Sequence, residues 1–504
     1  EEWVAKLKSA AVRVDISALG ELCSALLPYL VARRSSGPGR TRRADGSSEN
    51  SVVVSFLALL GSQVAALAKL DAKPADTEED GQLRYERAVA LAAAWAFGGA
   101  YQTKAERSTM DALLRARLPV AALPPLAKAA HFSKRDEQPK DIFDYGLDPA
   151  DMRWQLWERL HPPIPNHNPP GSFDPSSWVF YVPIPEATPC LAVMELLASQ
   201  GRGVLLTGRS EGTTTIGKHF LATRGPSVHR KYTSFSRTAC ATQLLSTLRD
   251  NIECRHQTTY GAARGRKHLY LLIDDLSLPF RAGAASPVSE VARQLMEQGG
   301  MLRGNRSIKV EGLVVFGVAA ARCGGIAALE PRFASHFYEL EVQPFSNASM
   351  ISIFRGSLDA CLSAGAKVEP QDLLACTPAL AKLVVRLLND MSTTFVPTPA
   401  QRDYVFDFGD VARVLGGMRL GIQRCGAGGL GTAQALLQLC VHECGRVFHD
   451  RLKDEDTSQM RELFQPRVTL ESLSAHYDAG EDFDALWKGR FCCYALESEP
   501  EPEP

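Results

Sequence analysis

Apolar residues recur at three- and four-residue spacing in two parts of the chain, which predicts helices there. Residues 1–130 read as a helical small domain. Its helices are expected at Ile16–Val31, Val52–Leu70, Tyr85–Tyr101 and Met110–Leu118. Residues 346–470 read as a helical lid. Its helices are expected at Ala348–Ser363, Gln371–Met391, Phe408–Gln423 and Thr432–Leu452.

Between them, residues 181–345 alternate short apolar runs with helical patterns, as a parallel sheet covered by helices on both faces requires. The strands are expected at Val204–Leu206, Leu269–Ile273, Gly312–Val318 and His336–Val342. The helices are expected at Pro189–Gln200, from Thr214 onward, at Ala239–Cys254 and at Ser289–Gln298. The predicted fold class is α/β, with a helical bundle before the sheet and a helical lid after it.

Two further segments complete the predicted domain plan. Residues 131–180 are aromatic and proline-rich and are expected to connect the first two domains, with Trp154 and Trp157 packed against a neighbour. Residues 471–504 are expected to begin another segment and to end in a disordered acidic tail, ESEPEPEP.

Composition narrows the function classes. The chain has 504 residues, 45% hydrophobic and 22% charged, which is ordinary for a soluble protein of several domains. Its net charge of −1 provides no global basic field for nucleic acid. No apolar run approaches the roughly 20 residues that span a bilayer, so no membrane partner is expected. The 12 cysteines lack C-x-x-C spacing, which predicts a reducing compartment and no structural zinc.

The strand at Val204–Leu206 runs into a hydroxyl-rich turn and a predicted helix, the layout of a phosphate-binding loop. A working loop reads G-x-x-x-x-G-K-[ST], whereas the chain from Gly208 reads GRSEGTTT. Thr213 therefore replaces the second glycine, Thr214 replaces the lysine, and Thr215 keeps the final hydroxyl. The candidate nucleotide-binding residues of this loop are Gly208, Gly212, Thr213, Thr214 and Thr215.

A second register starts at Gly212 and reads GTTTIGKH, which keeps Lys218 but lacks the final hydroxyl. The first register is preferred because the loop should begin where the strand ends. The second would lengthen the turn and leave only His219–Arg224 for the helix, too short for a useful dipole.

The apolar strand at Leu269–Ile273 ends in Asp274 and Asp275. P-loop NTPases hold magnesium with such acids at the carboxyl edge of the sheet. Asp274 would join Thr215 as a ligand of Mg²⁺. Asp275 would occupy the position at which a glutamate usually orients the attacking water, with a side chain one methylene shorter. An acid pair that caps the next turn is an equally weighted explanation.

Several strings resemble one family, the dynein heavy chain. They are DDLSLP at 274–279, PVSEVARQLMEQG at 287–299, PRF with HF at 331–337, PTPAQRDYVFDFGDVARV at 397–414, VHECGRVFHDRL at 441–452 and, upstream, WAFGG at 95–99. The first five are similar to the third AAA+ module of these motors, and the last to the small domain of the second. The resemblance implies an AAA+ fold over roughly residues 80–455.

The resemblance also implies roles for two arginines. Arg332 matches the arginine finger, which acts on a neighbouring module's nucleotide, and Arg413 matches the lid arginine near the γ-phosphate. Two departures accompany the lost lysine: Ala319–Ala321 stands where a polar sensor is expected, and Ala412 replaces a serine. The resemblance therefore implies a degenerate site that holds ATP or ADP with Mg²⁺ weakly or not at all, in a regulatory or structural role.

For the whole heavy chain, the resemblance implies an ATP-driven, minus-end-directed microtubule motor of the axonemal type, in the cytoplasm, the cytoskeleton and the cilium. The implied partners are other AAA+ modules of the same chain, dynein intermediate and light chains, and microtubules through parts outside these residues. Two alternatives stay open. One is a stand-alone P-loop ATPase that uses the Gly212–Lys218 register, and the other is a non-catalytic structural pseudo-ATPase.

Overall fold

The computed structural model describes residues 21–22, 24, 49–70, 78–125, 140–160, 181–208, 212–279, 286–303, 306–320, 329–363, 371–429, 432–470 and 487. Most of the predicted helix at Ile16–Val31, the residues 209–211 of the phosphate loop, Ala321 and the acidic tail lie outside these ranges. The chain divides into two compact units, Glu1–Pro344 and Phe345–Pro504. No described helix is long and apolar enough to cross a membrane.

From Glu49 on, the described part of the first unit has three helices ahead of the sheet: α3 (Glu49–Leu70), α4 (Glu78–Gly98) and α5 (Lys104–Arg115). Helix α4 ends at the glycine pair, as predicted. Helix α5 starts earlier than predicted, because Thr103 and Glu106 form a capping box that satisfies backbone N–H groups at its first turn.

A five-stranded parallel sheet forms the centre of this unit, in the order β11-β3-β10-β7-β4. Its strands are β3 (Val204–Gly208), β4 (Val228–Ser234), β7 (His268–Asp274), β10 (Leu313–Ala320) and β11 (Tyr338–Glu341). The associated helices are α7 (Thr188–Ser199), α8 (Thr213–Ala222), α9 (Ala241–Arg249), α10 (Pro287–Gln298) and α11 (Pro331–Ala334). The predicted parallel sheet is confirmed, with β4 as an additional edge strand.

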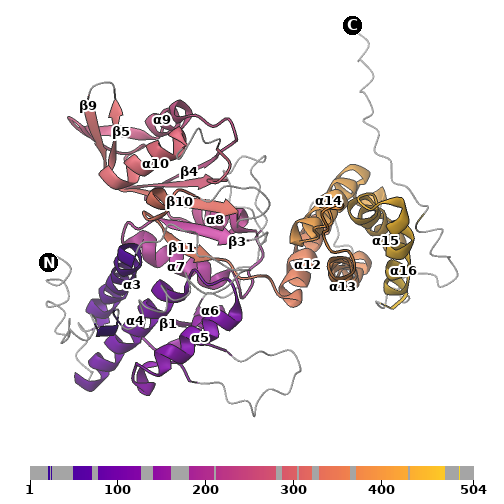
Figure 1. The fold of residues 1–504 in the computed structure, drawn as a ribbon, viewed down its shortest axis with the longest axis horizontal. Helices are drawn as coiled ribbons and strands as arrows, with labels where there is room; N and C mark the ends of the chain where they lie inside the picture. Colours follow the sequence, from indigo (N-terminus) through magenta and orange to yellow (C-terminus); the bar gives the residue numbers. More distant parts are fainter. Residues whose placement is uncertain are drawn as a thin grey trace, which may run out of the picture. The chain divides into compact units, whose positions relative to one another are not determined.

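A second, four-stranded sheet lies beyond the β4 edge (Figure 1), in the order β5-β6-β9-β8. Its strands are β5 (Ile252–His256), β6 (Thr259–Ala262), β8 (Gly300–Arg303) and β9 (Arg306–Val310). The predicted helix at Ala239–Cys254 is wrong in its second half. Helix α9 ends at Arg249, and Cys254 lies in β5, which pairs antiparallel with β6.

The aromatic segment at 140–160 packs on the first helices. It contains a short 3₁₀ turn (Ile142–Asp144), the hairpin β1 (Tyr145–Leu147) and β2 (Trp154–Leu156), and α6 (Trp157–Leu160). The Trp157 indole donates to the carbonyl of Phe143 at 2.9 Å, and the Trp154 indole donates to the carbonyl of Ala122 at 2.9 Å. Both tryptophans therefore act as anchors, as predicted.

Helices α3 to α5 join the sheet at its β11 edge (Figure 1). The buried guanidinium of Arg107 on α5 lies against the rings of Trp95 and Phe143, 5.4 and 5.2 Å from their centres. It also donates to the carbonyl of Glu341 on β11 at 3.0 Å. The backbone N–H of Glu341 in turn bonds the carbonyl of Gly99 at 2.9 Å. The bundle and the sheet thus share one buried interface.

The second unit is helical, as predicted. Its helices are α12 (Asn347–Ser363), α13 (Gln371–Thr394), α14 (Phe408–Gly429), α15 (Ala433–Cys444) and α16 (Asp454–Leu470). The predicted helix at Thr432–Leu452 is interrupted by a π turn at Gly445–His449. Helix α16, which the sequence pattern did not indicate, covers the same core with Met460, Phe464 and Val468.

Candidate nucleotide site

The predicted site residues lie at the carboxyl edge of the five-stranded sheet. Gly208 ends β3 and pairs with Ala320 of β10, while Asp274 ends β7 beside Ser234 of β4. Ligands of open α/β sheets bind at this edge. The structure therefore places the two predicted motifs at the same end of the parallel strands.

Helix α8 begins immediately after Gly212, which adopts a left-handed conformation at φ 67° that favours glycine. The first backbone bond of the helix runs from the N–H of Ile216 to the carbonyl of Gly212 at 3.0 Å. No side chain of the described residues caps this end, so the N–H groups of the first turn have no side-chain partner there and could meet an anion. Thr213, Thr214 and Thr215 occupy that first turn.

Thr214, at the lysine position, contacts the predicted magnesium acid directly. Its hydroxyl donates to Oδ1 of Asp274 at 3.1 Å. The Tyr232 hydroxyl on β4 donates to Oδ2 at 3.0 Å, and the backbone N–H of Asp275 donates to Oδ1 at 3.0 Å. Asp274 is buried, with 4% of its surface exposed. Both of its oxygens are therefore engaged by donors of this chain.

Asp275 has an unusual backbone conformation at φ 57°, which aspartate tolerates better than most residues. Its Oδ2 accepts a hydrogen bond from the Ser234 hydroxyl at 3.1 Å. Partial burial and then the neighbouring Asp274 raise the pKa of Asp275 above its usual range. This shift is of the kind that active-site acids show, and it also follows from two adjacent carboxyls in any setting.

The second register falls inside helix α8. Gly217 is buried, and a Cβ there would lie 3.0 Å from Leu272 of β7, so its small size is explained by the close approach of helix and strand. The ammonium group of the next residue, Lys218, lies 4.2 Å from the centre of the Tyr232 ring. These contacts give both residues a packing role a full turn beyond the start of the helix.

The donor set for Mg²⁺ is only partly suitable. The Thr215 hydroxyl makes no hydrogen bond to any described residue, so it remains available as a ligand. Asp274 already accepts three hydrogen bonds, and a metal ion would have to share or displace them. The described residues contain no group of three or more His, Cys, Asp or Glu able to hold a metal. Phosphate oxygens would have to complete the coordination shell.

Arg332 lies away from the predicted site, before the start of β11, whereas the sensor residues Ala319 and Ala320 end β10 beside Thr207 and Gly208 of β3. Arg332 is exposed on the short helix α11 and forms no ion pair with any residue that the structure describes. Ala319 is buried at the end of β10 and has no polar group to offer. The structure therefore brings Thr214 to Asp274, with Asp275 next to it, whereas Arg332 contacts none of these three residues within the described chain.

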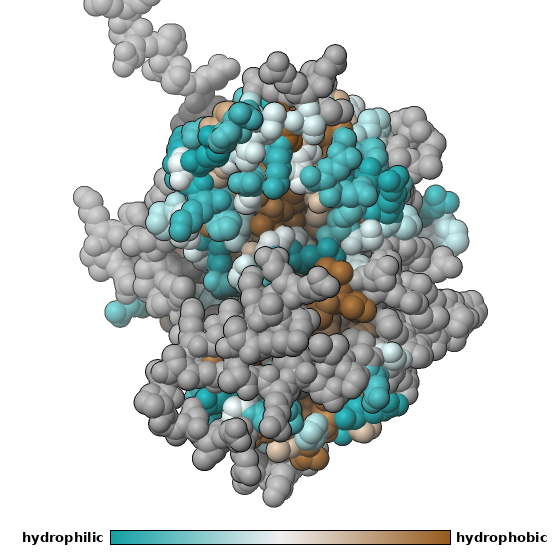
Figure 2. Space-filling view, turned by 90° about the vertical axis from the view of Figure 1, so that its left-hand side faces the viewer, coloured by the Kyte–Doolittle hydropathy of each residue, from teal (hydrophilic) through white to brown (hydrophobic). Residues whose placement is uncertain are grey.

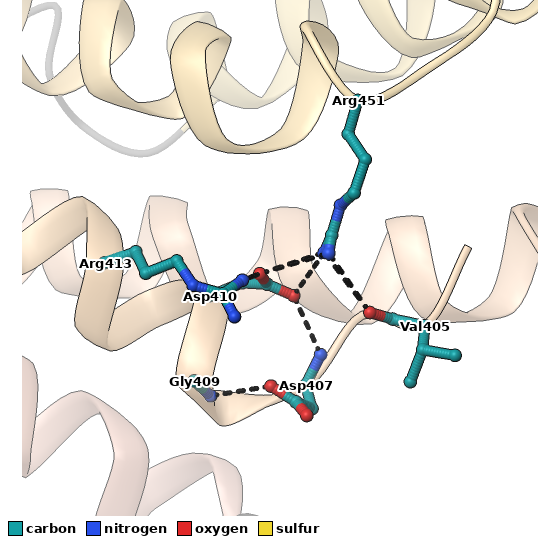
Figure 3. Close-up of polar contacts among 6 residues, drawn as sticks. All are labelled: Val405, Asp407, Gly409, Asp410, Arg413 and Arg451. Carbon is teal, nitrogen blue, oxygen red and sulfur yellow. Dashed lines mark hydrogen bonds and ion pairs between the residues drawn. The ribbon is translucent and has the colours of Figure 1, made fainter. Parts of the chain in front are cut away.

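Arg413 belongs to a buried polar network of the helical unit (Figure 3). Its neighbour Asp410 is fully buried and accepts hydrogen bonds from Arg451 at 2.9 and 3.0 Å and from Arg413. The backbone N–H of Asp407 also donates to Asp410, at 3.1 Å, and thereby caps α14. Arg413 itself is 63% exposed, so most of its side chain is free to meet another group.

Sequence reasoning missed Tyr232 and Ser234, which hold the two acids from the end of β4. Their strand, VHRKYTS, is an edge strand with half-exposed side chains and no apolar run. The available signal was the content of Val, Tyr and Thr after the turn residues Gly225-Pro226.

Comparison with known families agrees with this architecture. The model for the P-loop containing dynein motor region matches residues 175–345, and that for the dynein heavy chain AAA lid domain matches residues 45–159. A third model, the AAA+ lid domain, matches residues 380–485. The α/β domain is therefore an AAA+ domain, with lid domains on both sides in sequence.

Curated relatives point the same way. Dynein axonemal heavy chain 5 of Rattus norvegicus is 30% identical over 376 residues, 72% of this chain and 10% of its own length. Dynein axonemal heavy chain 6 of Homo sapiens is 26% identical over 351 residues, which are 68% of this chain and 8% of that protein. The dynein gamma chain of the flagellar outer arm of Chlamydomonas reinhardtii is 25% identical over 387 residues, which are 73% of this chain and 8% of that protein.

The chain thus spans a tenth or less of the length of these relatives. The family models cover most of its length in an unbroken order of lid, motor region and lid. On these grounds, the chain belongs to the dynein heavy chain family, and to its axonemal type.

Proposed function

We propose that this chain is the third AAA+ module of an axonemal-type dynein heavy chain, preceded by the end of the second. Its nucleotide site binds ATP or ADP weakly and hydrolyses ATP slowly or not at all. It would act in a regulatory or structural role within an ATP-driven, minus-end-directed microtubule motor of the cilium or flagellum. The order of lid, motor region and lid, and the strings shared with the third module, support this assignment.

One observation carries the claim of a degenerate site. Where a lysine would place a positive charge on the β- and γ-phosphates, Thr214 places a neutral hydroxyl that is bonded to Asp274. A charge-assisted contact of the missing kind contributes about 1.5–3 kcal/mol to binding. Its contribution to the transition state is usually larger, so hydrolysis should suffer more than binding.

The remaining residues take the following proposed roles. Backbone N–H groups from Gly212 to Thr215 cradle phosphate, Thr215 and Asp274 hold Mg²⁺, and Asp275 faces the attacking water. Arg332 acts on the site of a neighbouring module, and its exposure without a described ion pair suits that task. Arg413 takes the role of the lid arginine that the resemblance implies, and its side chain is 63% exposed.

The proposed location rests on the names of the relatives, and the proposed partners rest on the resemblance to dynein heavy chains. Their names place them in axonemes, in the flagellar outer arm and in an inner-arm complex. For this chain we infer the ciliary axoneme and its cytoskeleton. Its partners would be other AAA+ modules of the same heavy chain, intermediate and light chains, and microtubules contacted through other parts of the motor.

Equilibrium dialysis of the 504-residue chain with labelled ATP and ADP, with and without Mg²⁺, tests this function. Weak binding that Mg²⁺ strengthens, and that Asp274→Asn reduces, is the expected result. Lys218→Ala should leave binding unchanged, because Lys218 packs on Tyr232. Loss of binding in Lys218→Ala would instead support the stand-alone ATPase.

A purely structural role is the second candidate, and one observation favours it. Asp274 is already satisfied by Thr214, Tyr232 and the Asp275 N–H, so the edge of the sheet is held together without a ligand. The absence of any saturable binding at millimolar nucleotide would favour this reading over a regulatory site.

A further inference from the structure

A basic surface lies at the far end of the α/β domain from the helical bundle. Residues 224–268 contain nine Lys and Arg residues against only Asp250 and Glu253, in a chain whose net charge is −1. Part of this excess lies in the β5–β6 hairpin and in the turn between β6 and β7. Figure 2 shows that hydrophilic residues cover much of the upper part of this face, where Figure 1 places β5 and β9.

Four of the cations gather at one place, which we call the basic turn: Arg255, Arg264, Arg266 and Lys267. The Arg255 guanidinium of β5 donates to the carbonyls of Ala262 and Arg266, at 2.9 and 3.1 Å. Hydrogen bonds thus tie the hairpin to the turn and bring these positive charges together. Arg255, Arg264 and Lys267 are exposed, and Arg266 is half-buried.

The charges of the basic turn are only partly compensated within the described chain, by the Glu253 carboxylate near Arg255. The Arg255 and Arg266 guanidinium groups bond carbonyl oxygens, and none of the four side chains forms an ion pair with a described carboxylate. On the neighbouring strand β9, by contrast, Lys309 pairs with Glu311 at 3.5 Å. Uncompensated like charges at close range repel one another, and an anionic partner would relieve that repulsion.

The basic turn already holds one carboxylate. Arg264 and Gly265 are both left-handed, at φ 60° and 68°, and the N–H of Arg264 donates to Oε1 of Glu253 at 2.6 Å. The Arg264 and Gly265 N–H groups, together with the Arg255 charge, hold the pKa of Glu253 below its usual range. Consecutive N–H groups of this kind form an anion-binding concavity. Glu253 already fills this concavity, so the carboxylates of a partner would meet the exposed cationic side chains around it.

We propose that the basic turn is a docking surface for an acidic polypeptide segment, rich in glutamate or aspartate. Strand β5 is the edge of its sheet and is exposed from Glu253 to His256, so an extended segment has room beside the cations. A single-stranded nucleic acid fits less well, because it needs exposed aromatic rings to stack its bases. Tyr260 is half-buried and Tyr270 is buried, so within β5, β6 and the turn the only exposed ring is the imidazole of His256.

Fluorescence anisotropy of a labelled polyglutamate peptide with the full chain tests the proposal. Saturable binding that weakens as salt rises is the expected result. Reversing two exposed charges, with Arg264→Glu and Lys267→Glu together, should weaken binding about tenfold or more. The conservative pair Arg264→Lys and Lys267→Arg should bind as the parent does.

The matched control reverses Lys104 and Arg117, two exposed cations of the helical bundle, to glutamate. Circular dichroism and melting temperature confirm that each variant is folded. An equal loss in the control would mean general charge attraction and would overturn the proposal. It is equally overturned if no binding is detected at low salt, or if a labelled single-stranded oligonucleotide of matched charge binds more tightly. None of these readouts depends on nucleotide, so the proposal can fail independently of the proposed function.

Discussion

The residue that most changes the chemistry of this site is Thr214. A threonine at the second position of a helix cannot supply the charge of a lysine, yet it can bond an acid across the sheet edge, and here it bonds Asp274. The sequence predicted the missing lysine but not this substitute contact, because the contact joins residues 60 positions apart. Tyr232 escaped prediction for the same reason: its role depends on how β4 pairs with β7.

Asp275→Asn should stabilise the chain at neutral pH. The raised pKa of Asp275 means that the folded state favours the protonated acid, so ionisation costs stability as pH rises through that pKa. Asparagine carries no charge, can still accept from Ser234 and suits the left-handed backbone. The melting temperature of the variant should exceed that of the parent by more at pH 7 than at pH 3. A lower melting temperature at pH 7 would contradict this account.

His219 should make stability fall in acid. Its ring stacks on Tyr181, with 3.8 Å between centres, and burial followed by the Arg224 charge lowers its pKa from 6.5 to about 4. Between pH 6.5 and about pH 4, this histidine is protonated in the unfolded chain and neutral in the folded chain. The free energy of unfolding therefore decreases as pH falls through this range, by up to about 3 kcal/mol.

Urea unfolding at pH 7 and pH 4.5 measures the effect. His219→Phe keeps a ring on Tyr181 without a titrating group, and it should lose this part of the pH dependence. An unchanged dependence in the variant would assign the effect to other groups.

At the scale of elements, the glycine stop of α4 and the apolar runs could be predicted, whereas the capping box of α5 and the exposed strands were missed. The glycine pair ended α4 as predicted, and the buried strands β3, β7 and β10 appeared where apolar runs occurred. Strand β5 was taken for helix because it has one buried residue followed by four exposed ones, which leaves no alternation to detect. Its pairing with β6, rather than its own pattern, decides its conformation.

The lid offers an element-scale test. Asp410→Asn should destabilise the helical unit by about 3 kcal/mol, because it leaves Arg451 with an uncompensated charge at a buried carboxyl site. Arg413→Ala, by comparison, should cost less than about 1 kcal/mol, since its side chain is 63% exposed. Chemical denaturation followed by circular dichroism measures both. Equal losses in the two variants would show that Arg413 matters as much to stability as Asp410 does.

At the scale of the molecule, the sequence supplied the order of domains and the family, since these depend on strings that can be read locally. It did not supply the interface between the first helices and the sheet. That interface uses Arg107, Trp95 and Phe143 together with the backbone of β11, more than two hundred residues away. Contacts at such separations have no local signature.

Arg107→Ala should therefore weaken the bundle and the sheet together. It removes a buried side chain that packs on two rings and bonds β11, at a cost of roughly 2 kcal/mol or more. Thermal unfolding should show one transition for the first unit, shifted to lower temperature, whereas the exposed Arg117→Ala should leave it in place. A separate early transition confined to the helices would contradict a shared interface.

We propose that the nucleotide site has lost its positive charge at Thr214, while the strand before the loop and the helix after it are retained. Mg²⁺-ATP binding and turnover of the double variant Thr213→Gly with Thr214→Lys, which restores G-x-x-x-x-G-K-T, test it most directly. The parent should turn over ATP near background, and the variant should bind at least about tenfold more tightly. The matched variant Thr213→Gly with Thr214→Met, which adds length without charge, should not gain. Turnover by the parent that Lys218→Ala abolishes, with no gain from the restored lysine, would contradict the account.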